Sequence, residues 1–406
     1  MEKSKMKKKR ICVVTGSRAD YGHLLSVMRN LSDDPNVQLQ VVVTGSHLAR
    51  EQGYTYRQIK SDGFRIDAKV NILRFDDSEQ GITKRIGSGC QGFADAFHRL
   101  KPDIVVVLGD RYEILAATIA AYVANIPVAH IHGGESSEGA IDEGFRHAIT
   151  KMAYVHFPAT EIYRNRIIQL GEQPKNVFNF GAPCLDAIKE IRFLSKAELA
   201  RILNFDLSGR VAIVTFHPIT LEPAVSIKQL KNILAAIRIF DLKALFTKGN
   251  MDPQGRKINE TLARFCRKFP GRYRLVDNLG KQKYWSCLCC FDVMIGNSSS
   301  GFVEAPSFAL PVVNVGDRQR GRIRAPNIID ASYAVDDIRK AIAKALSPAF
   351  LNSLRGMRNP YGSYGGGQTG RRIKEKLKSI KLNGATFKKE FFDLGVSARK
   401  KVRSYA

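Results

Sequence analysis

With 406 residues, the chain is longer than one hydrophobic core usually supports, which favours two domains. An apolar fraction of 44% suits packed interiors, and no stretch approaches the ~20 uncharged apolar residues of a membrane-spanning helix. Of the net charge of +26, residues 1–10 carry +5 and residues 371–406 carry +9, so we expect an enzyme with an anionic substrate and no specific nucleic-acid binding.

The amino-terminal segment and the cysteines bear on where the protein works. Residues 1–10 run straight into a strand without the apolar core of a signal peptide, so we expect a cytoplasmic location. The seven cysteines form no evenly spaced framework, and the cluster of Cys287, Cys289 and Cys290 lacks a second ligand pair for a metal. We expect buried thiols in a reducing compartment and no metal site.

The first half of the chain alternates apolar strands with helices. Strands are predicted at residues 11–15, 39–43, 104–108, 128–131, 155–157 and 177–180, and helices at 22–31, 82–99, 113–124, 145–153 and 162–170. Short apolar strands separated by helices are typical of a parallel sheet that is covered on both faces. Because such crossovers are right-handed, we expect a doubly wound domain over residues 11–185, behind a basic extension at residues 1–10.

The alternation restarts after a turn at residues 181–186. A helix is predicted at 185–203, followed by strands at 211–216, 244–247, 273–276, 292–295 and 312–315. The second half is therefore another parallel α/β domain, residues 186–370, which ends in Gly-rich turns. Residues 371–406 give a basic helix at 371–380, which we expect to pack back on the first domain, and a weakly patterned tail.

Charged side chains gather where strands of the first domain end. In an open α/β sheet, ligands bind past the carboxyl ends of the strands, so carboxylates there are acid/base candidates. Segments 108–113, 130–135 and 141–147 supply four of them: Asp110, Glu135, Asp142 and Glu143. Each one alone fits equally well as a helix cap or an ion-pair partner. Nearby basic side chains are interpreted as groups that hold the carboxylates: Arg111, Arg146 and His147.

A turn rich in small residues, residues 15–22, follows the first strand. Its backbone N–H groups and the start of the next helix suit an anion, and Arg18 adds a forked contact to phosphate or carboxylate. The turn matches neither the G-x-G-x-x-G nor the Walker A pattern. The alternative is an ordinary strand–helix turn that Asp20 caps. Arg18 and Asp20 are therefore candidate binding residues.

A second turn of this kind, residues 296–304, follows a strand of the second domain. Hydroxyl groups and glycines at a strand-to-helix turn suit phosphate oxygens, and the turn offers Ser298, Ser299, Ser300 and Gly301. Glu304, one turn into the helix, is placed to accept from ribose hydroxyls. The alternative is a capped helix start.

Two more polar positions follow strands of the second domain. His217 precedes a proline at a strand end, which holds it in extended geometry; a ligand contact and a structural role fit it equally. Residues 317–322 place Arg318, Arg320 and Arg322 at alternate positions. They form either a solvated basic loop or an anion clamp that faces a diphosphate.

Together these motifs resemble those of the hydrolysing UDP-N-acetylglucosamine 2-epimerases of sialic acid and legionaminic acid biosynthesis. The resemblance lies in Gly-Ser-Arg-Ala-Asp-Tyr-Gly, Gly-Asp-Arg-Tyr-Glu, His-Ile-His-Gly-Gly-Glu, Ile-Asp-Glu-Gly-Phe-Arg-His, Asn-Ser-Ser-Ser-Gly-Phe-Val-Glu and Gly-Asp-Arg-Gln-Arg-Gly-Arg. They occur in the family's order between about residues 10 and 380, and their combination is far more specific than any one of them.

The resemblance implies a GT-B fold, in which two Rossmann-like domains hold a UDP-sugar in the cleft between them. It implies anti elimination of UDP with loss of the proton at C2 of the sugar, which gives a 2-acetamidoglycal. Water then adds with inverted configuration at C2 and releases the manno sugar. No metal or nicotinamide cofactor is implied. Relatives usually form dimers or larger assemblies, so we expect a homo-oligomer.

The resemblance also assigns roles to single residues. Asp110 and Asp142 become acid/base candidates, and His217 lies by the diphosphate. The phosphates and ribose are assigned to Ser298, Ser299 and Glu304, with Arg18 and Arg318 completing the anion site.

One departure from the family concerns His132. Some relatives carry a catalytic glutamate at this position, so the group that takes the C2 proton is open among His132, Glu135 and Asp142. A neutral imidazole can act as a base near pH 7.

Two substrates fit the motifs equally. One is UDP-N-acetylglucosamine, which gives N-acetylmannosamine. The other is UDP-2,4-diacetamido-2,4,6-trideoxyglucose, which gives the corresponding 6-deoxy manno sugar. The competing hypothesis is a GT-B glycosyltransferase with a UDP-sugar donor, which would share the nucleotide loops but need no carboxylate cluster.

Overall fold

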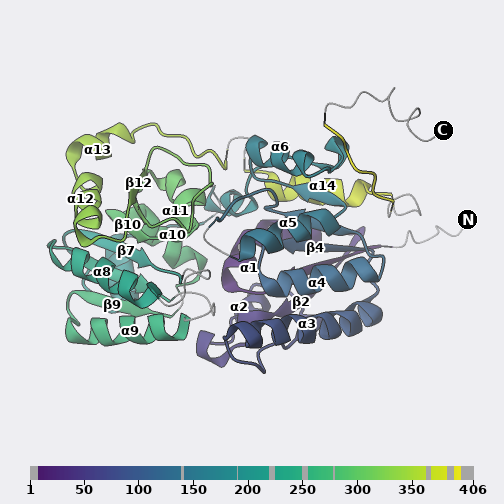
Figure 1. The fold of residues 1–406 in the computed structure, drawn as a ribbon, viewed down its shortest axis with the longest axis horizontal. Helices are drawn as coiled ribbons and strands as arrows, with labels where there is room; N and C mark the ends of the chain where they lie inside the picture. Colours follow the sequence, from purple (N-terminus) through teal and green to yellow (C-terminus); the bar gives the residue numbers. More distant parts are fainter. Residues whose placement is uncertain are drawn as a thin grey trace, which may run out of the picture.

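Two parallel sheets, each flanked by helices, lie side by side in the computed structural model (Figure 1). The structure describes residues 8–138, 141–189, 191–218, 225–248, 255–277, 279–362, 367–381 and 388–394. Most of the expected basic extension, residues 1–7, and the end of the tail, residues 395–406, lie outside these ranges. Within them, no helix is long and apolar enough to cross a membrane.

The first sheet has six parallel strands in the order β3-β2-β1-β4-β5-β6. Its strands are β1 (Lys9–Thr15), β2 (Val37–Thr44), β3 (Ala68–Val70), β4 (Ile104–Leu108), β5 (Val128–Ile131) and β6 (Val155–Phe157). The strand order reverses between β1 and β4, and the crevice at such a switch point is where open α/β sheets bind ligands. The turn after β1 and the loop after β4 both open onto that crevice.

The helices of the first domain cover both faces of this sheet. They are α1 (Arg18–Ser32), α2 (Tyr56–Ser61), α3 (Glu79–Leu100), α4 (Tyr112–Val123), α5 (Asp142–Met152) and α6 (Glu161–Gln169). Successive side chains of β1 point to opposite faces: Ile11 and Val13 belong to the core under α1, whereas Cys12 and Val14 belong to the core under α3 and α4.

The second sheet repeats the same topology, in the order β12-β11-β10-β7-β8-β9. Its strands are β7 (Val211–Thr215), β8 (Lys243–Thr247), β9 (Tyr273–Val276), β10 (Val293–Gly296), β11 (Val312–Val315) and β12 (Ile328–Ala331). The switch point lies between β7 and β10. His217 follows β7, and the turn at residues 296–304, called the serine turn below, follows β10. Both domains are therefore doubly wound and Rossmann-like, which confirms the predicted fold class.

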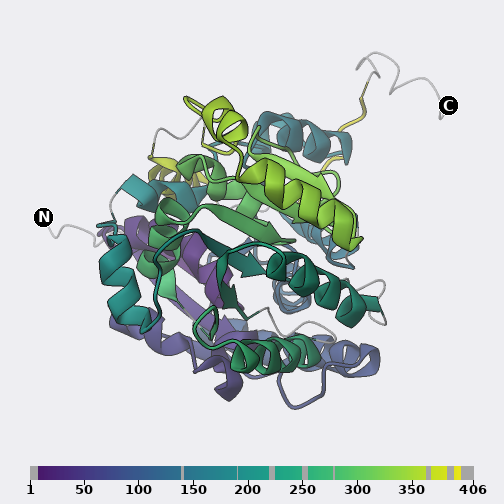
Figure 2. The same cartoon turned by 90° about the vertical axis from the view of Figure 1, so that its left-hand side faces the viewer.

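Helices also cover both faces of the second sheet. They are α7 (Lys196–Leu203), α8 (Ser226–Arg238), α9 (Gly255–Lys268), α10 (Gly280–Cys290), α11 (Ser300–Val303), α12 (Val335–Ala345) and α13 (Pro348–Ser353), whereas α14 (Thr369–Ser379) packs on the first domain. One core cluster joins α8, α9 and α12 to the sheet, and a second joins α7 and α10 to its other face. Figure 2 is viewed from the side of the second domain and shows α8, α9 and α12 in front.

The C-terminal helix α14 crosses back to the first domain, as predicted for residues 371–380. Ile373 and Leu377 are buried in the core that contains β1 and α1, and Lys378 pairs with Asp34 at 2.7 Å. The side chain of Lys9 donates to the last carbonyls of the helix, including that of Leu377 at 3.0 Å. Figure 1 shows α14, in yellow, beside α6 and away from the second sheet.

Two predicted elements were wrong. The single helix expected at 185–203 is broken: Pro183–Lys189 form a 3-10 turn, and α7 begins only at Lys196. Ser195 and Glu198 form a capping box, which makes Ser195 the start of a new helix. The strand expected at 177–180 is reduced to one isolated bridge, from Val177 to His156.

Candidate active site

Loops from both domains meet at the carboxyl ends of the two sheets. The guanidinium of Arg322, after β11, pairs with the carboxylate of Glu135, after β5. Arg320 pairs with Glu138 at 3.4 Å in the same place. The backbone N–H of Ile323 donates to the Tyr163 hydroxyl at 3.0 Å. These contacts bring together the acid/base segments and the arginine loop, which the sequence placed in different domains.

Arg146, on α5, organises the carboxylates of the first domain. Its buried guanidinium pairs with Asp110, which lies in the loop after β4, and with Glu143 at 2.6 Å. It also donates to the carbonyl of Glu135 at 3.0 Å and to the hydroxyl of Ser137 at 2.5 Å. Although burial opposes its charge, Asp110 and the other carboxylates raise the pKa of Arg146. The predicted role of Arg146 as a holder of carboxylates is confirmed.

His130, on β5, fixes the loop that carries Asp110. The imidazole Nε2 lies 2.7 Å from the carbonyl oxygen of Gly109, and Nδ1 lies 3.1 Å from the hydroxyl of Thr150. Gly109 has φ +77, which a side chain would rarely allow. Burial lowers the pKa of His130 to about 3, so this imidazole is neutral and serves as a support.

His132 and Glu135 form a buried pair beside this network. His132 Nδ1 lies 2.5 Å from Glu135 Oε1, and the two side chains are 8% and 4% exposed. His132 has φ +62, a strained value for a non-glycine residue, and such strain concentrates at functional sites. Since the charged carboxylate can only accept a hydrogen bond, Nδ1 carries the hydrogen, and the lone pair is left on Nε2.

Glu135 is held in its charged form. Burial opposes the charge, but Arg322, then His132, lower its pKa below the usual range for a carboxyl group. Arg322 takes Oε2 while His132 takes Oε1. A carboxylate with both oxygens engaged and a lowered pKa is a poor proton acceptor.

A second histidine, His23 of α1, stands edge-on against His132 with ring centroids 5.2 Å apart. Burial, with His132 and Lys281 nearby, lowers the pKa of His23 to about 3. Several buried nitrogens in this region have no hydrogen-bond partner among the described residues, and they include His23 Nδ1, His132 Nε2 and Lys281 Nζ. Buried polar groups are nearly always paired, so these atoms mark a place suited to polar groups of a ligand.

Asp142 is the first residue of α5 and is half-buried. It therefore lies on the same helix as Arg146, one turn away. The two residues before Ile141 are outside the described ranges. His147, on the same helix, lies 3.1 Å from Glu143, which agrees with its predicted supporting role.

The turn after β1 begins α1 earlier than predicted. Ser17, not Asp20, caps the helix: its hydroxyl accepts from the backbone N–H of Asp20 at 3.2 Å. Asp20 is buried and accepts from the N–H of Gly16 at 3.3 Å. Burial raises the pKa of Asp20 to about 7, against the opposing effect of Arg111.

Arg18 reaches the second domain. Burial lowers its pKa, while Tyr284 and Glu304 of the second domain oppose that shift. The carboxylate of Glu304 accepts from the indole N–H of Trp285 at 2.6 Å. Arg18, in the turn after β1, is therefore close enough to Glu304 for the two charges to interact across the domain boundary.

The serine turn is built around Asn297. Asn297 is buried, and its side-chain amide accepts from the N–H of His217 at 2.7 Å and donates to its carbonyl at 2.8 Å. This double contact locks the end of β7 to the end of β10. Arg318 joins the same turn by donating to the carbonyl of Asn297 at 3.3 Å. His217 and Arg318 thus lie beside the serine turn.

The three serines are not equivalent. Ser298 accepts from the N–H of Ser300 at 3.3 Å, and Ser299 is the N-cap position of α11. The hydroxyl of Ser300 accepts from Tyr284 at 2.8 Å. Gly301 packs so closely that a Cβ there would meet Val312 at 2.8 Å. Ser300 and Gly301 therefore shape the turn, and Ser298 and Ser299 are better placed to reach a ligand.

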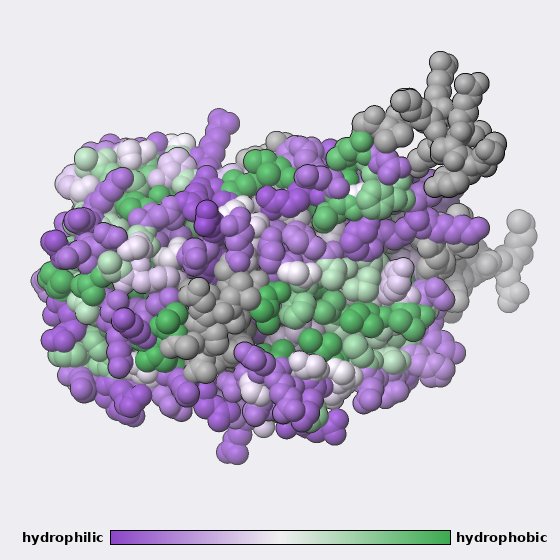
Figure 3. Space-filling view, in the orientation of Figure 1, coloured by the Kyte–Doolittle hydropathy of each residue, from purple (hydrophilic) through white to green (hydrophobic). Residues whose placement is uncertain are grey.

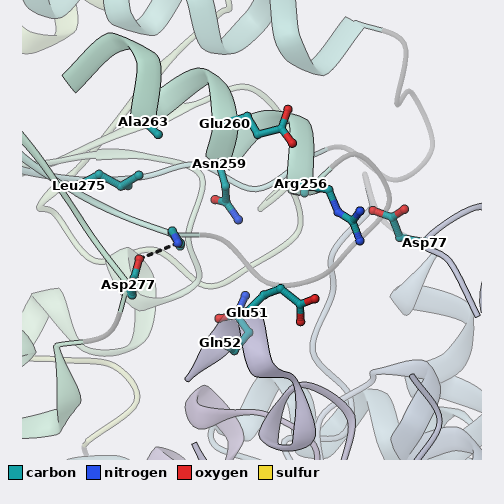
Figure 4. A pocket seen from close by; sticks show the side chains of 11 residues that line it. Glu51, Gln52, Asp77, Arg256, Asn259, Glu260, Ala263, Leu275 and Asp277 are labelled. Carbon is teal, nitrogen blue, oxygen red and sulfur yellow. Dashed lines mark ion pairs between the residues drawn. The ribbon is translucent and has the colours of Figure 1, made fainter. Parts of the chain in front are cut away.

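A cavity of about 420 Å³ lies elsewhere between the two domains (Figure 4). Glu51, Gln52 and Asp77 line it from the first domain. The second domain contributes Lys248, Gly255, Arg256, Asn259, Glu260, Ala263, Leu275 and Asp277. Lys248 and Asp277 pair across its wall at 2.6 Å. None of the predicted site residues lines this cavity.

Sequence reasoning missed His23, Lys281, Tyr284 and Asn297. Asn297 directly precedes the serines, so its place in the motif could have indicated it. The other three lie on helices α1 and α10, where single polar residues give no signal. Among the described residues, no three His, Cys, Asp or Glu side chains lie close enough to hold a metal ion.

Comparisons with known proteins agree with this arrangement. The chain matches the family model "UDP-N-acetylglucosamine 2-epimerase" over residues 29–378. It is 40% identical over 346 residues to the GDP/UDP-N,N′-diacetylbacillosamine 2-epimerase (hydrolyzing) of Campylobacter jejuni, covering 85% of this chain and 89% of that protein. It is 37% identical to the UDP-N,N′-diacetylbacillosamine 2-epimerase (hydrolyzing) of Legionella pneumophila, covering 94% and 98%.

Solved structures show the same fold. The UDP-GlcNAc 2-epimerase of Neisseria meningitidis, bound to UDP-GlcNAc, aligns with a TM-score of 0.77 at 19% identity and covers 91% of this chain and 100% of that one. With its two doubly wound domains, the chain has the GT-B architecture predicted from its motifs.

Proposed function

The chain belongs to the UDP-N-acetylglucosamine 2-epimerase family and is a hydrolysing UDP-sugar 2-epimerase, and we propose that its substrate is UDP-N,N′-diacetylbacillosamine. This is the 2,4-diacetamido-2,4,6-trideoxyglucose alternative of the two that the motifs allowed. Both relatives described above, at 40% and 37% identity, carry that sugar in their names. Because these relatives are hydrolysing epimerases, the glycosyltransferase hypothesis is not retained.

In the proposed reaction, a base takes the proton from C2 of the sugar while the C1–O bond to the β-phosphate breaks. The electron pair of the C–H bond forms the C1–C2 double bond, and UDP leaves with the electrons of the C1–O bond. Water then adds its hydroxyl to C1, and a proton returns to C2 from the opposite face. The products are the free manno sugar and UDP.

We assign the base to His132, and one observation carries this assignment. Its Nε2 is buried without a partner among the described residues, while Nδ1 lies 2.5 Å from Glu135. A base needs a lone pair that faces the reacting group and a neighbour that stabilises the charge it gains. His132 has both features. Glu135 itself is charged and engaged on both oxygens, so its proposed role is to orient His132.

Asp110 and Asp142 are the proposed groups for the opposite face of the sugar. Inversion at C2 requires that the proton return from the side away from the base. Asp110 approaches from the loop after β4, and Asp142 from the start of α5. Arg146, which pairs with Asp110, would hold that carboxylate in place.

The second domain is proposed to hold UDP. Ser298, Ser299 and Arg318 lie together with His217 around Asn297, which suits the diphosphate. Glu304 would accept from the ribose hydroxyls. Arg18 and Asp20 would close the site from the first domain.

We also propose a homo-oligomer in the cytoplasm. Helix α4 presents apolar side chains outward, and Tyr122 and Val123 at its end are 54% and 75% exposed. Figure 3 shows apolar side chains gathered over α4 on this face. A second copy of the chain would cover them. The seven cysteines are all free, which suits a reducing compartment.

The substrate proposal is tested by competition between the two UDP-sugars in one reaction. We expect the diacetamido sugar to be turned over with a kcat/KM at least about tenfold higher, a difference of about 1.4 kcal/mol in transition-state binding. A preference for UDP-N-acetylglucosamine would overturn the substrate but leave the reaction class intact.

A further inference from the structure

We propose that Arg322 of the second domain is a positioning residue for the reaction: by pairing with Glu135 across the cleft, it holds the Glu135–His132 pair in its working arrangement. The proposal rests on the assignment of His132 as the base. It adds that the base is complete only when the second domain contributes its arginine.

The contact geometry divides one carboxylate between the two domains. Glu135 Oε1 lies 2.5 Å from His132 Nδ1 of its own domain, and Oε2 accepts from Arg322 Nη1 of the other domain. The Arg322 side chain is only 9% exposed. A buried carboxylate without a cationic partner either takes up a proton or turns towards water. Arg322 therefore keeps Glu135 charged and oriented.

The position of Arg322 is itself built into the interface. On one side, Gly321 has φ +82, and a Cβ there would lie 2.6 Å from the hydroxyl of Ser136. On the other side, the N–H of Ile323 donates to the Tyr163 hydroxyl, which lies 2.8 Å from the hydroxyl of Tyr361. Both chain neighbours of Arg322 are thus fixed against the first domain when Arg322 meets Glu135.

Charged and titratable groups from several elements face this pair. Arg146 of α5 contacts the carbonyl of Glu135, and His23 of α1 stands against His132. Lys281 acts electrostatically on His23, and the groups that act on Arg322 include Tyr163, Tyr361 and Asp110. Among the described residues, only Arg322 comes from the second domain and contacts the carboxylate directly.

The proposal predicts opposite pH effects for two variants. Loss of a positive charge favours protonation of a nearby base, so Arg322→Gln should move the ascending limb of the pH profile of kcat/KM to higher pH. Loss of the negative charge in Glu135→Gln should move the same limb to lower pH. A purely structural role would lower activity in both variants without moving the limb.

The experiment compares Arg322→Gln, Arg322→Lys and Arg320→Gln in the full-length protein. Arg320 is the matched control, because it pairs with Glu138 across the same interface but is 72% exposed. We expect Arg322→Gln to lower kcat between about 10- and 100-fold, with UDP affinity changed less than about threefold. In Arg322→Lys, the ascending limb of the pH profile should stay at the pH of the unmodified protein. In Arg320→Gln, both kcat and the position of this limb should stay unchanged.

Three outcomes would overturn the inference. In the first, the ascending limb of the pH profile of kcat/KM of Arg322→Gln stays where it is in the unmodified protein. In the second, Arg322→Gln loses turnover only to the extent that it loses UDP affinity. The third applies if Arg322→Gln does not fold. An ascending limb of the pH profile of Arg322→Lys that lies at higher pH than in the unmodified protein would then contradict the inference. Failure of the proposed function looks different, since the unmodified protein would then release no UDP from either sugar.

Discussion

His132 Nδ1 lies 2.5 Å from Glu135 Oε1, with both side chains buried at the boundary between the domains. The hydrogen bond fixes the proton on Nδ1 and leaves Nε2 as the lone-pair nitrogen. The other carboxylates of the cluster are held by Arg146 or stand at the start of α5. This pair therefore separates one base candidate from the several that the sequence offered.

Replacing His132 by Gln should strongly lower turnover while preserving nucleotide binding. General-base catalysis contributes about 10²- to 10⁴-fold, so we expect kcat to fall by that range and UDP affinity to change little. Release of UDP and titration calorimetry measure the two quantities. His98→Gln, on the exposed side of α3, is the control. Turnover of His132→Gln within threefold of the unmodified protein would remove His132 from the mechanism.

Asp110→Asn should also retain UDP binding and lose turnover, because the nucleotide is proposed to lie on the other domain. The substitution weakens the contact between residue 110 and Arg146. It does not leave the buried charge of Arg146 without a partner, because Glu143 also accepts from Arg146. The measurement is UDP release against UDP affinity. Unchanged turnover would exclude Asp110 as an acid/base group.

Arg146→Gln should destabilise the first domain. Its guanidinium is buried and serves Asp110, Glu143, Ser137 and the carbonyl of Glu135. Removal of one partner from a buried ion pair costs about 3–5 kcal/mol. Urea unfolding measures the loss. Arg339→Gln is the control, because its pair with Asp336 is exposed and should contribute at most about 1 kcal/mol. Equal losses for both variants would contradict the role of Arg146.

Asp20 should give the stability a pH dependence of its own. Its pKa is raised by burial to about 7, so between about pH 4 and pH 7 the folded state binds the proton that the unfolded chain has lost. Its contribution to stability therefore falls as the pH rises through that window. We expect Asp20→Asn to gain stability relative to the unmodified protein on going from pH 5 to pH 8, by on the order of 2–4 kcal/mol.

Urea unfolding at both pH values tests this sign. Asp95→Asn, on the exposed side of α3, should show no such difference between the two pH values. The prediction would be contradicted if the free energy of unfolding of Asp20→Asn, relative to the unmodified protein, were higher at pH 5 than at pH 8.

The segment at residues 388–394 should contribute to stability and not to catalysis. Phe392 packs against Ile167, Ile168 and Val177, whereas Phe391 is 58% exposed. We expect Phe392→Ala to lower the free energy of unfolding by about 1–3 kcal/mol and Phe391→Ala by clearly less, with kcat unchanged in both. A loss of activity at unchanged stability would instead place this segment near the chemistry.

Much of the fold could be predicted from the sequence because its strands are uninterrupted apolar runs between turns, as in Ile104–Leu108. The break before Ser195 was missed because the apolar spacing continues across it and only the cap reveals a new helix. The composition of the site was also visible, in motifs that follow strand ends. The pairing of Arg322 with Glu135 was not, because these residues are 187 positions apart and only the packing of two domains brings them together.

In the proposed mechanism, the C2 proton of a UDP-sugar is taken by a group that exchanges with solvent before another proton returns. Incubation of the protein with UDP-N,N′-diacetylbacillosamine in deuterium oxide, followed by mass spectrometry, tests it most directly. We expect UDP and a free manno sugar with one deuterium at C2. A free sugar without deuterium at C2, or one that retains the gluco configuration, would contradict it.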